Sequence, residues 1–150
     1  MTQTTGGDHY GDVIVRVSGL EYTVDGRVIL EDIDFDVREG EIFGIMGMSG
    51  SGKSTTLRCL MGLIEATAGT IEIDGEFLTD RSEDELNPIR MKMGMCFQMA
   101  ALFDSMTVYE NVAFGLKRHT QLTGDEIDGR VAESLSIVGL TGFEDYMPSD

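Results

Sequence analysis

The chain has 150 residues, and its 27 acidic and 11 basic residues give a formal net charge of −16. This length suits about one domain with a buried core, and the negative charge argues against binding nucleic acid or anionic lipid headgroups through bulk electrostatics. No apolar run approaches the ~20 residues of a membrane-spanning helix, and the polar N-terminus lacks the features of a signal peptide, so we expect a cytoplasmic chain with no direct membrane span.

The N-terminal part of the sequence predicts strands. Residues 1–11 are expected to be disordered, and the β-branched run Val13–Val17 predicts the first strand. The turn dipeptide Asp25-Gly26 predicts a hairpin leading into Val28–Leu30. Apolar and charged side chains then alternate along Ile33–Val37, as in a half-buried strand. These elements together predict an antiparallel β subdomain.

The segment from Gly47 to Ser54 reads G-x-x-x-x-G-K-S and is the most informative part of the sequence. The apolar run Glu41–Met46 before it predicts a strand, and the apolar spacing of Leu57 to Ile64 after it predicts a helix. A phosphate-binding P-loop requires this order of strand, glycine-rich turn and helix. An accidental match is the alternative, and it is expected on the order of once in a hundred chains of this length.

In a P-loop, glycines allow successive backbone N–H groups to converge on phosphate oxygens, and the helix that follows adds its free N–H groups. Lys53 would reach the β- and γ-phosphates of a nucleotide, and the Ser54 hydroxyl would complete a magnesium shell. The predicted nucleotide-binding residues are Gly47, Met48, Ser49, Gly50, Ser51, Gly52, Lys53, Ser54 and Thr55.

Beyond the P-loop helix the sequence predicts two more strands and then helices. Polar and apolar side chains alternate in Thr70–Asp74, which predicts a short strand, and Met93–Phe97 predicts a strand that stops at Gln98. Two capping boxes follow, Thr107–Glu110 and Thr123–Glu126, each leading into apolar residues at helical spacing. The sequence thus predicts an α/β nucleotide-binding architecture with a helical region.

From about Val13 to Asp150 the chain resembles the ATP-binding subunit of ABC transporters. Gly47–Thr55 matches the Walker A segment of that family, and Gly94–Gln98 looks like its Q-loop, in which Gln98 would contact magnesium and the attacking water. The resemblance implies a P-loop NTPase of the ABC type that uses ATP and Mg²⁺.

The resemblance also implies an organisation and partners. Residues 12–150 would be the N-terminal part of one nucleotide-binding domain, with the β subdomain and P-loop core in 12–98 and the start of the helical subdomain in 99–150. The implied partners are a transmembrane permease subunit and a second copy of the intact ATPase. The chain would then lie peripherally at the inner face of the cytoplasmic membrane. The apolar run Ala100–Phe103 just past Gln98 is expected to contact the permease, and packing in the core is an equal expectation for Leu102 and Phe103.

Three functions stay open for this lineage. Several segments resemble the ATPases of Mla- or Mce-type phospholipid transporters, a group sometimes labelled "resistance to organic solvents". Those segments are Phe97–Val108, Glu110–Phe114, Arg118–Thr120, Val138–Leu140 and Met147–Asp150. The run Ile45–Lys53 also looks like that of betaine and amino-acid importers, and a non-hydrolytic nucleotide-binding module is the third alternative.

Two positions depart from the family pattern. Val24 stands where many ABC ATPases stack an aromatic side chain on adenine, and Tyr22, on the same strand face, is the alternative contact, although an ordinary packed tyrosine is an equal expectation. The sequence also stops at Asp150, just before the expected Leu-Ser-Gly-Gly signature. We therefore expect an incomplete core sheet, no assignable general base and no hydrolysis by these residues alone.

Overall fold

The computed structural model describes residues 10–98 and 101–150, which divide along the sequence into two compact units, with the boundary between Met95 and Cys96. Of the segment 1–11, which was predicted to be disordered, residues 1–9 lie outside the described residues. The backbone N–H of Gly11 donates to the carbonyl of Glu39 at 3.2 Å, so Gly11 lies beside the residue that follows the second strand. Met99 and Ala100, at the predicted start of the helical subdomain, also lie outside the described residues.

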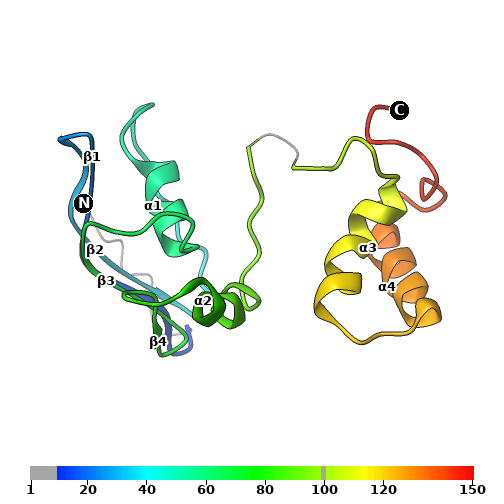
Figure 1. Cartoon of the computed structure of the whole chain (residues 1–150), viewed down its shortest axis with the longest axis horizontal. Helices are drawn as coiled ribbons and strands as arrows, with labels where there is room; N and C mark the ends of the chain where they lie inside the picture. Colours follow the sequence, from blue (N-terminus) through cyan, green and yellow to red (C-terminus); the bar gives the residue numbers. More distant parts are fainter. Residues whose placement is uncertain (1–9, 99–100) are drawn as a thin grey trace. The chain divides into compact units, whose positions relative to one another are not determined.

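The first unit is built on an antiparallel sheet (Figure 1). Its strands lie in the order β2-β1-β3-β4, and each neighbouring pair is antiparallel. Their bounds are β1 (Val13–Val24), β2 (Arg27–Arg38), β3 (Ala68–Ile73) and β4 (Glu76–Phe77). The antiparallel β subdomain predicted from the sequence is therefore confirmed.

Strand β2 joins two segments that were predicted as separate strands, Val28–Leu30 and Ile33–Val37. Asp32, between them, has a φ of 49°, and the pairing of β2 with β1 shifts at this point. A β-bulge of this kind inserts a residue without ending the strand, because the pairing resumes on both sides of it.

Apolar side chains from the sheet and two helices form the core of the first unit. The helices are α1 (Lys53–Leu60) and α2 (Glu83–Arg90). The buried cluster consists of Val17, Leu20, Leu30, Phe35, Cys59, Ile71, Ile73, Leu78, Leu86 and Ile89. Leu20 and Ile89 are fully buried, and burial of such a side chain contributes about 1.5–3 kcal/mol. This core fixes α1, and with it the start of the predicted phosphate site, against β2.

Two predicted strands are absent. Neither Glu41–Met46 nor Met93–Phe97 forms a strand, and Ile42 and Met46 are 97% and 93% exposed. An extended segment becomes a strand only when its N–H and C=O groups pair with a neighbour, and no strand within residues 10–98 and 101–150 pairs with either segment. The parallel core sheet is thus incomplete in the described residues, as expected.

The second unit contains the helices α3 (Val108–His119) and α4 (Gly124–Ile137), which begin directly after the two predicted capping residues, Thr107 and Thr123. Their facing sides bury Ala113, Ile127, Val131 and Leu135. The Tyr109 hydroxyl also donates to the carboxylate of Asp128 at 2.5 Å. No helix in the described parts of the chain combines the length and apolarity needed to cross a membrane.

The capping box of α4 leads to a prediction about how the stability of this helix depends on pH. The Glu126 carboxylate accepts hydrogen bonds from the backbone N–H and the hydroxyl of Thr123, at 2.7 and 2.8 Å, and these bonds hold the pKa of Glu126 below its ordinary value of 4.5. A lowered pKa in the folded state stabilises the fold at neutral pH, and this contribution is lost as the pH falls through the folded value. Glu126→Gln should therefore weaken α4 at neutral pH but not in acid.

Urea unfolding followed by helical circular dichroism, at neutral pH and at about pH 3, checks this prediction. Glu133→Gln is the matched control, because Glu133 lies on the same helix with a 67% exposed side chain outside the cap. A loss of stability for Glu126→Gln that is the same at both pH values would contradict the prediction.

Candidate functional site

The loop before α1 has the conformation that its glycines permit. Gly50 and Gly52 have φ values of 81° and 88°, in the left-handed region that favours glycine. The Ser51 N–H donates to the carbonyl of Met48 at 3.2 Å and closes the turn. A Cβ added at Gly47 would lie 2.6 Å from the Ser51 hydroxyl oxygen. The loop therefore leaves little room for a side chain at Gly47, while Gly50 and Gly52 are favoured by their left-handed backbone conformation.

Gly52 fixes the loop to the sheet. A Cβ at this position would lie 2.5 Å from the Cδ2 of Leu30 and 3.1 Å from the carbonyl oxygen of Ile29. The backbone of the loop thus packs directly on β2, immediately before α1 begins.

The first turn of α1 presents unused donors. The N–H and hydroxyl of Thr56 both bond to the carbonyl of Gly52, at 2.8 and 3.1 Å. The N–H groups of Lys53, Ser54 and Thr55 precede this bond and have no acceptor within the helix. The first turn contains no acidic residue. A helix start of this kind attracts a phosphate group.

The ammonium of Lys53 lies over the loop. Its Nζ donates to the carbonyls of Gly47 and Met48, at 2.9 and 2.7 Å, and lies 3.5 Å from the Ser51 hydroxyl. The charge is therefore held against the loop that leads into the start of α1. This set of donors, with a backbone free of Cβ atoms at Gly47 and Gly52, fits the phosphate chain of a nucleotide.

The exposed hydroxyl of Ser54 is free to bind a magnesium ion from the first turn of α1. Gln98, the other predicted magnesium contact, is an exposed residue of the second unit. Because Ser54 belongs to the first unit, the approach of Gln98 to it stays a prediction.

The two candidate adenine contacts differ in burial. Tyr22 is partly buried against the core of the first unit, as an ordinary packed tyrosine would be. Val24 is 42% exposed at the end of β1, beside the turn at Asp25 and Gly26. The contact of either side chain with adenine stays a prediction.

Sequence reasoning did not single out Asn111, which organises the loop before α3. Its amide nitrogen donates to the carbonyls of Phe103, Met106 and Thr107, and its oxygen accepts from the Phe103 N–H. The ring of Phe103 packs on Phe114, with centroids 4.8 Å apart, yet it remains 46% exposed. An asparagine inside a predicted helix, four residues after the capping threonine, was the available signal.

The sequence matches the family described as "ABC transporter" over residues 30–149. It is 41% identical over 138 residues to the "Probable ribonucleotide transport ATP-binding protein mkl" of Mycobacterium leprae, covering 92% of this chain and 40% of the relative. It is 49% identical over 116 residues to the "Glycine betaine transport ATP-binding protein OpuAA" of Bacillus subtilis, covering 77% of this chain and 28% of the relative. The chain thus spans less than half the length of these relatives.

The fold also matches a solved structure of the ATP-binding cassette MJ0796 bound to ADP and Pi. The TM-score is 0.80 at 32% identity, covering 90% of this chain and 62% of that one. The names of the relatives report different transported compounds, and neither name mentions phospholipids. Family match, sequence identity and fold agree with one another: the chain belongs to the ABC transporter family, and its fold is that of the family's ATP-binding domain.

Proposed function

We propose that this chain binds ATP with Mg²⁺ through Gly47–Thr55, as part of the ATP-binding subunit of an ABC transporter that couples ATP hydrolysis to transport. The observation that carries the proposal is the Lys53 ammonium bonded to the carbonyls of Gly47 and Met48, in the loop that leads directly into the free N–H groups of the first turn of α1. Bound phosphates would take hydrogen bonds from those N–H groups and from Lys53, while Ser54 and Gln98 would contact the magnesium ion.

A transmembrane permease and a second copy of the intact ATPase are the proposed partners. Leu102 and Phe103 are exposed apolar side chains on a loop whose backbone Asn111 holds in place. A rigid loop with exposed apolar tips suits a protein contact, because little conformational entropy is lost on docking. We therefore propose that this loop contacts the permease and keeps the subunit at the inner face of the cytoplasmic membrane.

Phospholipid is the proposed cargo, on the basis of the segment Phe97–Val108 and its resemblance to Mla- and Mce-type ATPases. Betaine or an amino acid is the second candidate, and the 49% identity to the glycine betaine protein of Bacillus subtilis favours it. The two candidates can be distinguished with the intact transporter in detergent solution, where phospholipid is present only when it is added. Stimulation of its ATPase by added phospholipid, and not by glycine betaine, is expected if the cargo is lipid.

Replacing Lys53 by methionine tests nucleotide binding. We expect the affinity for MgATP to fall about tenfold to a hundredfold, because hydrogen bonds to charged groups contribute about 1.5–3 kcal/mol. Titration calorimetry measures the affinity, and circular dichroism verifies the fold of the variant. Lys117→Met, which changes an exposed lysine on α3, should bind MgATP as the parent does. A folded Lys53→Met variant with parental affinity would overturn the proposed function.

A further inference from the structure

The guanidinium of Arg90, at the end of α2, bonds in two directions. Towards its own helix, its Nη1 and Nη2 donate to the two carboxylate oxygens of Glu83, at 2.6 and 3.3 Å. Towards α1, its Nε donates to the carbonyl of Met61 at 3.1 Å and its Nη2 donates to that of Gly62 at 2.6 Å. The Arg90 side chain is only 20% exposed. It therefore joins α2 directly to the end of α1.

The carbonyls that Arg90 binds belong to the closing turn of α1. Met61 is the C-cap of the helix, and Gly62 follows it with a φ of 61°. The N–H groups of Gly62 and Leu63 bond back to Cys59 and Arg58, both at 2.9 Å. A cation at this end of a helix also neutralises the partial negative charge of the carbonyls. Arg90 thus fixes the position of the C-terminal end of α1 and neutralises the partial negative charge there.

A displacement of the C-terminal end of α1 would also displace the phosphate site at the N-terminal end of this helix. The helix has eight residues, so it is about 12 Å long and moves as one piece. Its first turn carries Lys53 and Ser54, whose geometry must be held within about 0.5 Å to be effective. On the basis of the proposed function, we propose that Arg90 is a positioning residue for the nucleotide site, acting through α1.

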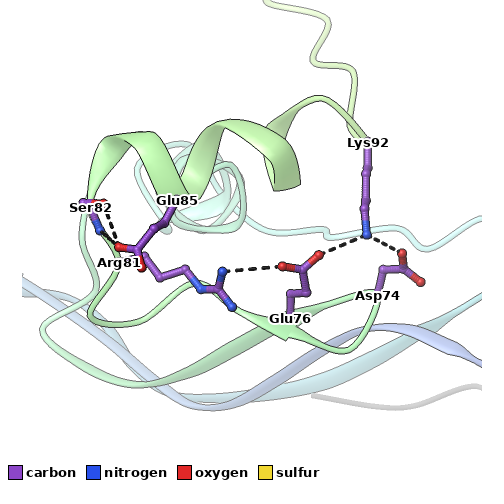
Figure 2. A network of polar contacts seen from close by, with 6 residues as sticks. All are labelled: Asp74, Glu76, Arg81, Ser82, Glu85 and Lys92. Atoms are coloured by element: carbon purple, nitrogen blue, oxygen red, sulfur yellow. Dashed lines mark hydrogen bonds and ion pairs between the residues drawn. The ribbon is translucent and has the colours of Figure 1, made fainter.

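Arg81, which precedes the N-cap of α2, offers a matched comparison. Its guanidinium pairs with Glu76 at 3.4 Å, and Glu76 also binds Lys92, which bonds to Asp74 (Figure 2). This network ties the residues that flank α2 to β4 and to the turn between β3 and β4. Within the described part of the chain, Arg81 donates no hydrogen bond to α1. Loss of Arg81 should therefore loosen α2 without moving the phosphate site.

The experiment compares Arg90→Met, Arg90→Lys and Arg81→Met. We expect Arg90→Met to weaken MgATP binding about threefold to tenfold, as changes in a coupling network do. Arg90→Lys should restore part of the affinity, because an ammonium still reaches one carbonyl of α1. Arg81→Met should keep the parental affinity. Equal MgATP affinities of the folded Arg90→Met and Arg81→Met variants would overturn the proposal. If Arg90→Met does not fold, the MgATP affinities of Arg90→Lys and Arg81→Met are compared instead, and equal values would again overturn it.

Amide hydrogen exchange gives a second readout that needs no nucleotide. The Thr56 N–H, bonded to Gly52 in the first turn of α1, should exchange faster in Arg90→Met than in Arg81→Met. Equal exchange rates in the two variants would contradict the role of Arg90. If the parent chain itself does not bind MgATP, the proposed function fails, whereas the exchange rates still decide whether Arg90 holds the start of α1.

Discussion

Replacing Gly69 by alanine is expected to destabilise the first unit by about 2–5 kcal/mol. Gly69 lies in β3 with a φ of 87°, and a Cβ there would lie 2.3 Å from the carbonyl oxygen of Gly19 and 2.7 Å from the Cα of Leu20. Backbone atoms of β1 cannot rotate away as a side chain can. The cost combines about 1–2 kcal/mol for the left-handed conformation with about 1–3 kcal/mol for overpacking.

Gly75→Ala separates these two costs. Gly75 has a φ of 78° in the turn between β3 and β4, and a Cβ there would meet no atom within 4 Å. We expect it to cost only the conformational part, about 1–2 kcal/mol. Urea unfolding followed by circular dichroism measures both variants. Equal losses for Gly69→Ala and Gly75→Ala would show that the close approach of β3 to β1 does not constrain the sheet.

Local signals predicted the helices of the second unit well. Thr107 and Thr123 each precede an acidic residue at the third helical position, and both helices begin where these capping boxes place them. The same pattern, Ser82 with Glu85, begins α2, which was not predicted. Pro88 lies inside that helix, and a proline there argues against a helix because it removes a backbone hydrogen bond. Burial of Leu86 and Ile89 against the sheet compensates for this loss.

Strands depend on partners that a local pattern does not contain. The run Glu41–Met46 has the apolar composition of a buried strand, yet Ile42 and Met46 are exposed, since no strand in the described residues pairs with it. In contrast, the alternation in Ile33–Val37 predicted a strand that forms, because β2 pairs with β1 across the two-residue turn Asp25-Gly26. The alternation in Thr70–Asp74 likewise predicted most of β3, whose partner β1 lies far away in sequence. The presence of a partner strand in the described residues therefore decided which predicted strands form.

The candidate site likewise has features that a local sequence pattern predicts and features that depend on tertiary contacts. The positions of Lys53 and the loop glycines follow from the P-loop motif, because the motif is a local conformation with a local chemistry. The contact of Arg90 with Met61 and Gly62 spans 28 residues or more along the chain. The packing of Gly52 on Leu30 likewise arises only when β2 and α1 meet. A sequence motif therefore identifies the groups that bind the nucleotide, whereas tertiary contacts determine which parts of the fold hold those groups in position.

Replacing Gly52 by alanine should damage both the fold and nucleotide binding. The φ of 88° costs an L-residue about 1–2 kcal/mol, and the new Cβ would lie 2.5 Å from the Cδ2 of Leu30. Leu30 is 4% exposed in the core, so relieving the clash costs about 1–3 kcal/mol more. Because α1 begins at the next residue, relief by movement of the helix would displace Lys53. We expect MgATP affinity to fall at least about tenfold, as loss of a charged hydrogen bond does.

Gly50→Ala is the control for this variant, since Gly50 lies in the same loop with a φ of 81° and a Cβ there would meet no atom within 4 Å. It should cost only about 1–2 kcal/mol and leave the start of α1 in place. Urea unfolding gives the stabilities, and calorimetry with MgATP gives the affinities. A larger loss of both quantities for Gly52→Ala than for Gly50→Ala is expected if contact with β2 positions the helix. Equal losses would mean that the loop requires glycine for its conformation alone, and that the packing of Gly52 on Leu30 does not align Lys53 with the phosphates.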